Sequence, residues 1–467
     1  MGSLGVSGRI LVLLSSAAIA ACGGGGYGGG DGGSPPTASI SLSIDPSTIT
    51  LGQSATLTWN TNGASCTATG SWSGTKSATG SEDVTPTATG TFTYTLSCAG
   101  GGYGESARRS VMLTVEAAAA FTSTLLVAGF SGSEAVTTDR KLVSPRGLAV
   151  AEEGPVRVVG RGMAIAFDGG GKPDPALRSA EGEATPATGG MELTDVVANL
   201  TREFVLNGAD GSGPAEFIFA SKDGVIGAWR GGMGPADAVI VHVAPDGAVY
   251  TGLAVAEHKG RALLYAADLR NSKVDVFDAT FMRQPSRPGR FDFADPALPT
   301  GYAPFGIHAI AGGADGTVQL YVTYARQLPP DNRDSAAGAG LGLVNVFDTN
   351  GKLLQRLVQV GGALNAPWGV ARAPADFGSL GGALLIGNTG DGTINAFDDA
   401  SGRHIGTVSD ADGRAIARPG LWGLTFGNDS HRQPHDTLFF TAATDETDGV
   451  LGRIDVGLMP HAPGIDD

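Results

Sequence analysis

An internal repeat in the second part of the chain constrains its fold more than any other feature. Each copy has a glycine that precedes an apolar residue and usually follows a proline or an aromatic residue. Five copies are centred on Gly147, Gly252, Gly306, Gly369 and Gly423. The last three gaps between these glycines are 54, 63 and 54 residues, and the first, 105 residues, is about twice as long. This spacing predicts a sixth, degenerate copy, which we place near Phe204-Val205-Leu206.

A pair of strands follows each glycine motif. An apolar strand leads through a turn containing Asp, Asn or Gly to a second strand that ends in an aromatic residue, as in Leu384–Asn388 and Ile394–Asp398. Asp-Gly and Asn-Gly turns supply the positive φ that tight hairpins need. A unit of about four short strands that recurs every ~50–60 residues is typical of a propeller blade, and no 3.6-residue apolar stripe persists. We expect a six-bladed β-propeller over residues 121–460, closed by pairing of Ser123–Val127 with the last blade.

The N-terminus predicts export and a membrane anchor. One positive charge, Arg9, precedes an apolar stretch that is too short to span a bilayer. The stretch ends in Ile19-Ala20-Ala21-Cys22, which resembles the bacterial lipobox, whose cysteine is acylated and becomes the new N-terminus. The resemblance implies a signal peptide over residues 1–21 and a lipid anchor on Cys22. The Gly-rich residues 22–36 predict a flexible tether. We expect the chain on the outer membrane or cell surface of the bacterial envelope; the alternative is an ordinary secretory signal.

Residues 37–116 alternate between polar and apolar positions. In Ser54–Trp59 the odd-numbered residues are apolar, and in Thr91–Cys98 the even-numbered ones are. Such alternation indicates half-buried antiparallel strands, and five to seven of them in about 80 residues predict a β-sandwich. The segment resembles bacterial Ig-like domains, which implies either a stalk or an adhesive module. We favour the stalk, so the expected chain is all-β, with an N-terminal Ig-like β-sandwich followed by the propeller.

Two cysteines remain for a disulfide if Cys22 is lipidated. In an exported chain the even pair, Cys66 and Cys98, implies a bridge that closes a loop of about 33 residues. In antibody domains the first cysteine precedes the buried tryptophan, whereas Trp59 precedes Cys66 here. We therefore expect the bridge to join other strands than in an antibody domain.

Several motifs of the large domain resemble a known family. They are Gly301–Phe305, Tyr321–Ala325, Leu364–Gly369, Gly387-Asn388 with Gly390–Gly392, Leu421-Trp422 and Phe439–Ala442. Together they resemble an uncharacterised bacterial family of six-bladed β-propellers over residues 121–455. Some members of that family carry a C-terminal PEP-CTERM sorting tail, for which the lipobox would substitute here. The resemblance implies a fold but no activity.

The charge of the chain bears on its partners. It has 31 basic and 46 acidic residues, a net charge of −15, and no run of Lys or Arg. Because such a chain repels phosphate backbones, we exclude nucleic acid as a partner. The expected partners are the membrane, through the lipid anchor, and a protein or polysaccharide ligand.

Carboxylate and carboxamide side chains are the strongest candidates for a site. They follow strands or begin blades, where they can converge on one mouth of the channel, and they are Asp268, Asn365, Asn388, Asp391, Asp445 and Glu446. Oxygen ligands of this kind suit Ca²⁺, as in lactonase-type propellers, although Asp and Asn also cap tight turns by bonding their own backbone. We favour turn capping, assign no cofactor, and expect a non-enzymatic binding or scaffold module. The alternative is a calcium-assisted hydrolase with these residues at the channel mouth.

Three further features leave two interpretations each. His431 and His435 are spaced to bind a metal on a helix, but their segment reads as a loop. The insertion Arg326–Gly342 is either a binding element or an inert excursion. Three tryptophans are either stacking platforms for a polysaccharide or inter-blade packing, which we favour: Trp229, Trp368 and Trp422.

Overall fold

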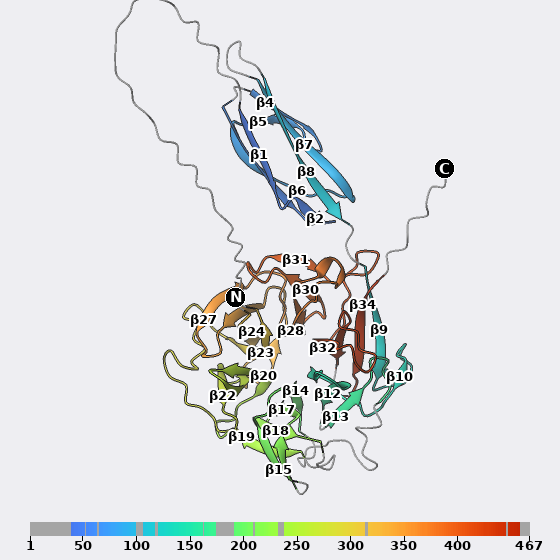
Figure 1. Ribbon diagram of the computed structural model, residues 1–467, viewed down its shortest axis with the longest axis vertical. Helices are drawn as coiled ribbons and strands as arrows, with labels where there is room; N and C mark the ends of the chain where they lie inside the picture. Colours follow the sequence, from blue (N-terminus) through green and yellow to red (C-terminus); the bar gives the residue numbers. More distant parts are fainter. Residues whose placement is uncertain are drawn as a thin grey trace, which may run out of the picture. The chain divides into compact units, whose positions relative to one another are not determined.

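The alternating segments of the sequence fold into β-strands. The computed structural model describes residues 39–51, 53–62, 65–99, 106–116, 120–161, 163–173, 191–208, 211–231, 238–312, 316–444 and 447–457. In these residues every regular element is a β-strand, apart from a 3-10 helix at Gly378–Leu380, which confirms the all-β class (Figure 1). The described ranges contain no helix with the length and apolar character needed to cross a bilayer. The predicted signal peptide 1–21, Cys22 and the tether 22–36 lie outside them.

Strands β1 to β8 form a β-sandwich of two sheets. One sheet contains β1 (Ile40–Asp45), β3 (Ala55–Thr61) and β6 (Thr79–Val84). The other contains, in order, β2 (Thr48–Thr50), β8 (Ala107–Glu116), β7 (Gly90–Ala99), β4 (Ser65–Gly70) and β5 (Gly74–Lys76).

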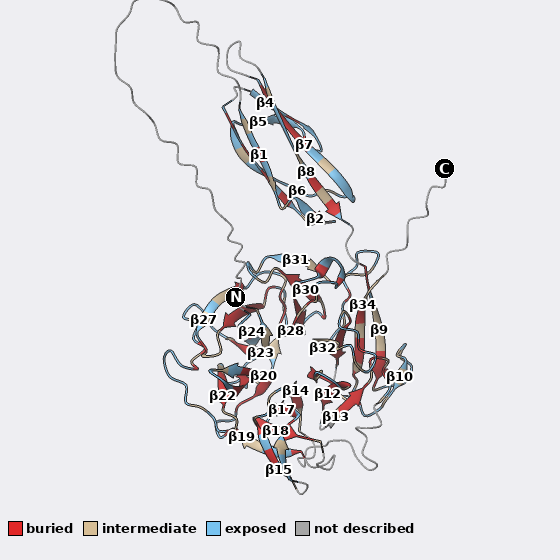
Figure 2. Cartoon of the chain, in the orientation of Figure 1, coloured by how far each residue is buried: buried red, intermediate tan, exposed pale blue. Residues whose placement is uncertain are grey.

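The two-residue period of the sequence places apolar side chains between these two sheets. Leu57 in β3 and Leu96 in β7 are fully buried, while the neighbours of Leu57 along β3 face outward. Figure 2 shows both buried and exposed residues along the strands of this unit. Trp72 lies edge-on to Trp59 at 5.4 Å and to Tyr94 at 6.2 Å between ring centroids, so one indole contacts an aromatic residue of each sheet.

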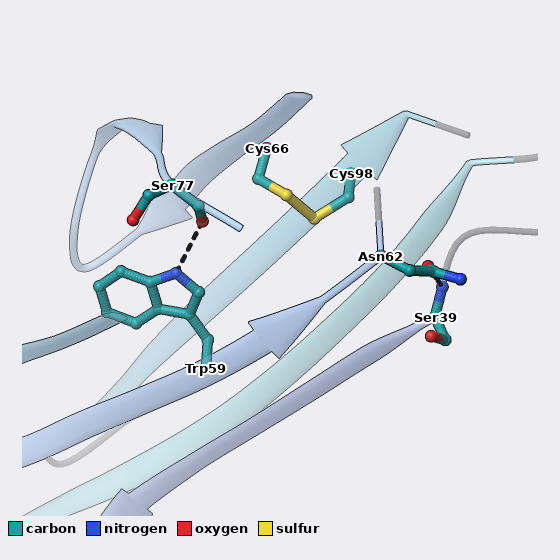
Figure 3. Close-up of a disulfide and its surroundings, with 6 residues drawn as sticks. All are labelled: Ser39, Trp59, Asn62, Cys66, Ser77 and Cys98. Carbon is teal, nitrogen blue, oxygen red and sulfur yellow. Dashed lines mark hydrogen bonds between the residues drawn. A yellow bond between two sulfur atoms is a disulfide. The ribbon is translucent and has the colours of Figure 1, made fainter. Parts of the chain in front are cut away.

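A disulfide joins Cys66 and Cys98, as the sequence predicts. The two residues face each other in the paired strands β4 and β7, and both are buried (Figure 3). The bridge therefore links neighbouring strands of one sheet rather than two sheets. Trp59 lies in the other sheet, and its Nε1 donates a hydrogen bond to the Ser77 carbonyl at 3.0 Å. With a sequence separation of 32 between the cysteines, the bridge stabilises this unit by about 3–4 kcal/mol if loop entropy dominates.

The rest of the described chain forms six sheets of three to five strands. The first contains β11 (Leu148–Ala149), β12 (Val156–Gly160) and β13 (Met163–Phe167); the second β14 (Leu193–Ala198), β17 (Phe217–Ser221), β18 (Val225–Trp229) and β19 (Val239–Val243). The third contains β20 (Tyr250–His258), β21 (Arg261–Asp268) and β22 (Lys273–Phe277); the fourth β23 (Tyr302–Ala311), β24 (Val318–Gln327), β26 (Gly342–Phe347) and β27 (Leu353–Val358), with the short β25 (Ser335–Ala336) beside β24.

The last two sheets contain the C-terminal strands and the beginning of this unit. The fifth contains β28 (Pro367–Arg372), β29 (Leu384–Asn388), β30 (Ile394–Phe397) and β31 (His404–Thr407). The sixth contains β32 (Leu421–Phe426), β33 (Leu438–Ala442), β34 (Val450–Val456), β9 (Phe121–Ala128) and β10 (Thr137–Thr138). A separate hairpin, β15 (Val205–Gly208) and β16 (Gly211–Pro214), lies between β14 and β17 in sequence.

The first strands of the six sheets form a closed ring. Contacts between strands run from β11 to β14, β20, β23, β28, β32 and back to β11, and we call these six the inner strands (Figure 1). Each neighbouring pair of sheets encloses its own apolar cluster, because alternate residues of a strand face the sheets on either side. In β21, for example, Leu264 packs toward the second sheet and Tyr265 toward the fourth. Sheets stacked radially in this way make a β-propeller.

The expected closure of the ring by the N-terminal strand of this unit is confirmed. β9 pairs antiparallel with β34, the last strand of the chain, so that Ser123 faces Ile454 and Val127 faces Leu451. Phe121 at the start of β9 packs on Phe377 of the neighbouring sheet with ring centroids 4.7 Å apart. Both ends of the unit therefore meet in one sheet, which leaves no unpaired edge between the first and last repeats.

The repeated glycine marks the closest approach between neighbouring inner strands. At the motif, five of the six inner strands, all except β11, shift register against their second strand, for example between Tyr250 and Gly252 and between Pro304 and Gly306. A Cβ on Gly306 would lie 2.3 Å from the Trp368 carbonyl oxygen of the next inner strand, and one on Gly369 would lie 2.7 Å from that of Trp422. A side chain at these positions would force the strands apart, which explains the recurrence of glycine.

The sixth copy of the motif is not where the sequence placed it. The prediction near Phe204-Val205-Leu206 is wrong, because Phe204 precedes the hairpin strand β15. The inner strand of the second sheet is β14, and its register shift falls between Leu193 and Asp195. Asp195 therefore occupies the position of the glycine, and the copy escaped detection because it lacks the residue that identifies the others.

Candidate functional site

Three aromatic side chains of the repeat converge at the centre of the ring. Phe305, Trp368 and Trp422 each precede the motif glycine of their inner strand, at the point where the strand bulges. The Trp422 ring lies 5.5 Å from that of Phe305 and 5.8 Å from that of Trp368. Trp368 is 2% exposed, and its Nε1 donates a hydrogen bond of 2.7 Å to the Thr251 carbonyl, two sheets away. These three residues, the aromatic cluster, divide the centre of the propeller into two hollows.

The larger hollow, the channel cavity, has a volume of about 520 Å³. Residues from all six inner strands line it, and most are apolar, including Leu148, Val196, Leu253, Ile310, Val370 and Leu424. Trp368 lies at one end. Glu257 and Arg372 lie at the other, and the Arg372 guanidinium is paired with Asp399.

Asp195 is a buried carboxyl in the wall of the channel cavity. It is 4% exposed, and its two oxygens accept hydrogen bonds from the backbone N–H of Val196 at 2.8 Å and of Leu253 at 2.7 Å. Burial raises the pKa of Asp195 to about 8, against the opposing effect of the two backbone hydrogen bonds. The side chain is therefore largely uncharged at neutral pH, and it bridges two neighbouring inner strands.

His308 is the second titratable group with an altered pKa in the cavity wall. Its Nε2 lies 3.0 Å from the Trp368 carbonyl oxygen, to which it donates, and its ring stands edge-on to the Trp368 ring. Burial lowers the pKa of His308 to about 4, so the imidazole is neutral at pH 7. Asp195 and His308 thus leave this part of the cavity polar but uncharged.

The insertion in the fourth sheet crosses the ring at the end of the channel opposite Glu257 and Arg372. Its loop Leu328–Ala337, here called the strap, reaches the turn between β17 and β18 in the second sheet. Lys222 in that turn contacts the Asp334 carboxylate at 2.5 Å, and Arg333 donates to the Lys222 carbonyl at 3.1 Å. On the opposite side, the Gly338 N–H donates to Asn365 Oδ1 at 2.6 Å, which fastens the end of the loop to the fifth sheet. The insertion is therefore attached to the second sheet on one side and to the fifth on the other.

The smaller hollow, the strap pocket, lies beneath this loop and has a volume of about 260 Å³. It is lined by Phe305, Trp422 and Thr251 from the inner strands, by Lys222 and Thr389 from turns, and by Arg333, Asp334 and Ser335 from the strap. The inner-strand residues that line it come near the start of their strands, whereas those of the channel cavity come mainly later. The two hollows therefore follow one another along the channel, with the aromatic cluster between them.

The four candidate ligands of the sequence that the structure describes do not assemble into one site. Asp268 lies at the end of β21 in the third sheet, where it accepts hydrogen bonds from the N–H of Val249 and Asn271. Burial raises its pKa, and the hydrogen bonds and Lys273 act against that. Asp445 and Glu446 lie outside the described residues.

The other three candidates, Asn365, Asn388 and Asp391, do lie together in the fifth sheet. Asn388 Oδ1 accepts the Asn365 N–H at 3.0 Å, and Asp391 Oδ2 accepts the Asn365 side-chain amide at 3.1 Å. Asp391 Oδ1 also accepts the Thr393 N–H within its own turn. Asp391 thus bonds the backbone of its own turn, as turn capping requires, whereas the Asn388 side-chain oxygen bonds a residue 23 positions away.

This arrangement does not favour the calcium-assisted hydrolase. The oxygens of Asn388 and Asp391 already accept hydrogen bonds, and Asp268 belongs to a different sheet. Among the residues that the structure describes, no group of three or more His, Cys, Asp or Glu is placed to hold a metal ion.

The histidine pair and the tryptophans have structural partners. His435 lies 2.9 Å from both Asp429 and Asp376, and these carboxylates raise its pKa to about 9. His431 contacts Ser430 instead, so the two histidines do not form a pair. Trp229 is buried beneath the guanidinium of Arg157, which packs over its ring at 4.7 Å. Trp229 and Trp368 act in packing, whereas Trp422 remains partly exposed at the strap pocket.

Comparison with known proteins gives relatives of unassigned function. No protein-family model matches the chain. An uncharacterized protein of Acanthamoeba polyphaga mimivirus is 33% identical over 266 residues, which is 56% of this chain and 62% of the relative. A second one is 34% identical over 207 residues, or 44% of this chain and 51% of the relative. The chain thus spans little more than half the length of the curated relatives it matches.

Solved structures with a similar fold are distant. An auxiliary nutrient binding protein from Bacteroides ovatus has a TM-score of 0.41 at 11% identity and covers 89% of this chain and 97% of its own. The WD40 domain of Toxoplasma gondii coronin has a TM-score of 0.36 at 8% identity and covers 91% of this chain and 89% of its own. At this level of similarity neither match assigns this chain to a family or gives it a function.

Proposed function

We propose that the chain is a non-enzymatic binding module of the bacterial cell envelope. In this proposal the six sheets are the six blades of a propeller that presents the ligand site. The sandwich is an Ig-like stalk, and lipidated Cys22 fixes the chain to the outer membrane or cell surface. Support comes from the closed ring of inner strands, the buried disulfide and the lipobox-like sequence at Ile19–Cys22.

The channel cavity is the main support for a binding function. Its size, about 520 Å³, lies within the range of small-molecule sites, and its wall is apolar with two uncharged polar groups, Asp195 and His308. Glu257 and Arg372 lie only at the far end from Trp368, so a charged ligand beside Asp195 and His308 would lose its hydration without gaining a counter-charge, whereas an apolar ligand would release water from both surfaces. The cavity therefore suits a small, uncharged and mainly apolar molecule that enters at the end opposite the aromatic cluster.

The test uses the full chain with Cys22→Ala, so that no lipid competes, and the neutral apolar fluorophore N-phenyl-1-naphthylamine. We expect a saturable rise in its fluorescence. Thr425→Trp, which places a large ring in the cavity wall, should abolish the rise. Thr138→Trp, on the exposed strand β10, is the matched control and should leave the rise unchanged. A rise that survives Thr425→Trp in a chain with unchanged melting would contradict the channel as the site.

The anchor is tested separately by labelling growing cells with a clickable palmitate analogue. The native chain should take up the label and sediment with membranes, and Cys22→Ala should do neither. Label on the Cys22→Ala chain, or its absence from the native chain, would leave an ordinary secretory signal as the better explanation.

A further inference from the structure

We propose that the strap pocket is a second binding site, for a single neutral saccharide ring. It is distinct from the channel cavity in position and in chemistry, because the aromatic cluster separates the two and the strap places charged groups beside that cluster, whereas Glu257 and Arg372 lie at the far end of the cavity. Its volume, about 260 Å³, is below that of typical drug-sized sites, so the ligand is small.

Charge balance around the pocket decides the class of ligand. Lys222 is 8% exposed and lies 2.5 Å from Asp334 and 3.3 Å from Glu192, and Glu192 is also paired with Arg146. Arg333 lies 3.3 Å from Asp223. Among the residues that the structure describes, three cations thus face three carboxylates. An anion or a cation gains no net attraction from these six groups, and a purely apolar ligand would displace water from them without replacing its hydrogen bonds.

A polyhydroxyl ligand fits the hydrogen-bonding groups that remain. In the described part of the chain, the Trp422 indole N–H and the Ser335 hydroxyl have no hydrogen-bond partner, and both residues line the pocket. Arg333 offers further N–H donors, and the exposed Asp334 carboxylate offers acceptor positions. A sugar hydroxyl donates one hydrogen bond and accepts others, so it can satisfy both kinds of group at once.

The inner wall of the pocket supplies an apolar surface for the carbon skeleton of the sugar. Phe305 and Trp422 from neighbouring repeats lie there beside Thr251. The C–H groups of a pyranose can pack against these rings while its hydroxyls face the strap. Trp422 combines both functions, since its ring is apolar and its Nε1–H is polar.

Binding is measured by saturation-transfer NMR with the full chain carrying Cys22→Ala. The probes are D-glucose, D-galactose and D-mannose, with D-glucuronate and D-glucosamine as charged analogues. At least one neutral hexose should bind saturably, and its charged analogues should bind more weakly. Tightest binding of glucuronate or glucosamine, or no binding by any of the three neutral hexoses, overturns the proposal.

Two substitutions locate the site. Asp334→Asn and Ser335→Ala should each weaken hexose binding, the first by about tenfold because it removes a charged acceptor. Asp412→Asn removes an equally exposed carboxylate, paired with Arg414 outside the pocket, and should have no effect. Undiminished binding in both strap variants, with melting unchanged, places the sugar elsewhere and overturns the proposal. Binding of the apolar fluorophore should be the same in all three variants, so failure of this site is distinguishable from failure of the channel cavity.

Discussion

Asp195 stands at the single inner-strand position where the other five repeats have glycine. Its neighbours Gly147 and Gly252 lie against the next strand with no room for a Cβ, whereas Asp195 directs its carboxyl to the Leu253 N–H. A side-chain hydrogen bond from the Leu253 N–H to Asp195 thus replaces the close contact between the two backbones that glycine allows elsewhere. Because it does so in a buried position, its protonation is coupled to folding.

This coupling predicts the pH dependence of stability. The folded chain holds the Asp195 proton up to a pKa of about 8, while the unfolded chain releases it near the ordinary value of 3.8. Between these values the folded state binds more protons, so this group lowers the free energy of unfolding as pH rises. Asp195→Gly should remove that dependence, and the variant should gain stability relative to the native chain from pH 5 to pH 8. The measurement is urea unfolding of both chains at pH 5 and pH 8. The prediction is contradicted if the free energy of unfolding changes equally with pH in the two chains.

At the scale of elements, the sequence predicted the repeat and the closure of the ring but not the strap. The repeat can be recognised in the sequence because one backbone constraint, the close approach at Gly306 and its equivalents, requires glycine at five of the six positions. The copy at Asp195 was missed because a different interaction meets the same constraint. The contact between Arg333 and Lys222 joins residues that are 111 positions apart and follows no period, so no local pattern indicates it.

The candidate site, like the fold, could be predicted from the sequence only in part. Asp391 caps its own turn, as Asp beside a Gly indicates, but the contacts of Asn388 and Asn365 join residues that are 23 positions apart, which no local pattern indicates. The channel cavity depends instead on which side chains of six separate strands face one axis. Asp195 and His308 could not be selected from the sequence, since their burial follows from the assembled ring.

Ring closure by β9 gives a prediction at this scale. Phe121 is buried where β9 meets the fifth sheet, and its N–H donates to the Ser409 carbonyl at 2.9 Å. Phe121→Ala should remove the contact with Phe377 and destabilise the propeller by about 3–5 kcal/mol. The exposed Val136→Ala, just before β10, is the control and should change stability by less than about 0.5 kcal/mol. Comparable losses in urea unfolding would show that β9 does not hold the ring closed.

At the scale of the whole molecule, the chain contains two units that share no sheet. β1 to β8 make the sandwich and β9 to β34 make the propeller, and each has its own buried core. The disulfide lies in the first unit, and the two proposed binding sites lie in the second. Two separate cores predict two unfolding transitions, to which a single free energy of unfolding does not apply.

Differential scanning calorimetry of the Cys22→Ala chain tests this separation with two independent perturbations. Replacing both cysteines of the bridge, as Cys66→Ala with Cys98→Ala, should lower one transition, because the unfolded sandwich regains the entropy that the bridge restricts. Saturating N-phenyl-1-naphthylamine should raise the other, since a ligand that binds only the folded propeller stabilises that unit by RT ln(1 + [L]/Kd). If the cysteine substitutions shift both transitions together, the two units unfold as one. In that case the sandwich is part of the fold of the propeller rather than a stalk that carries it.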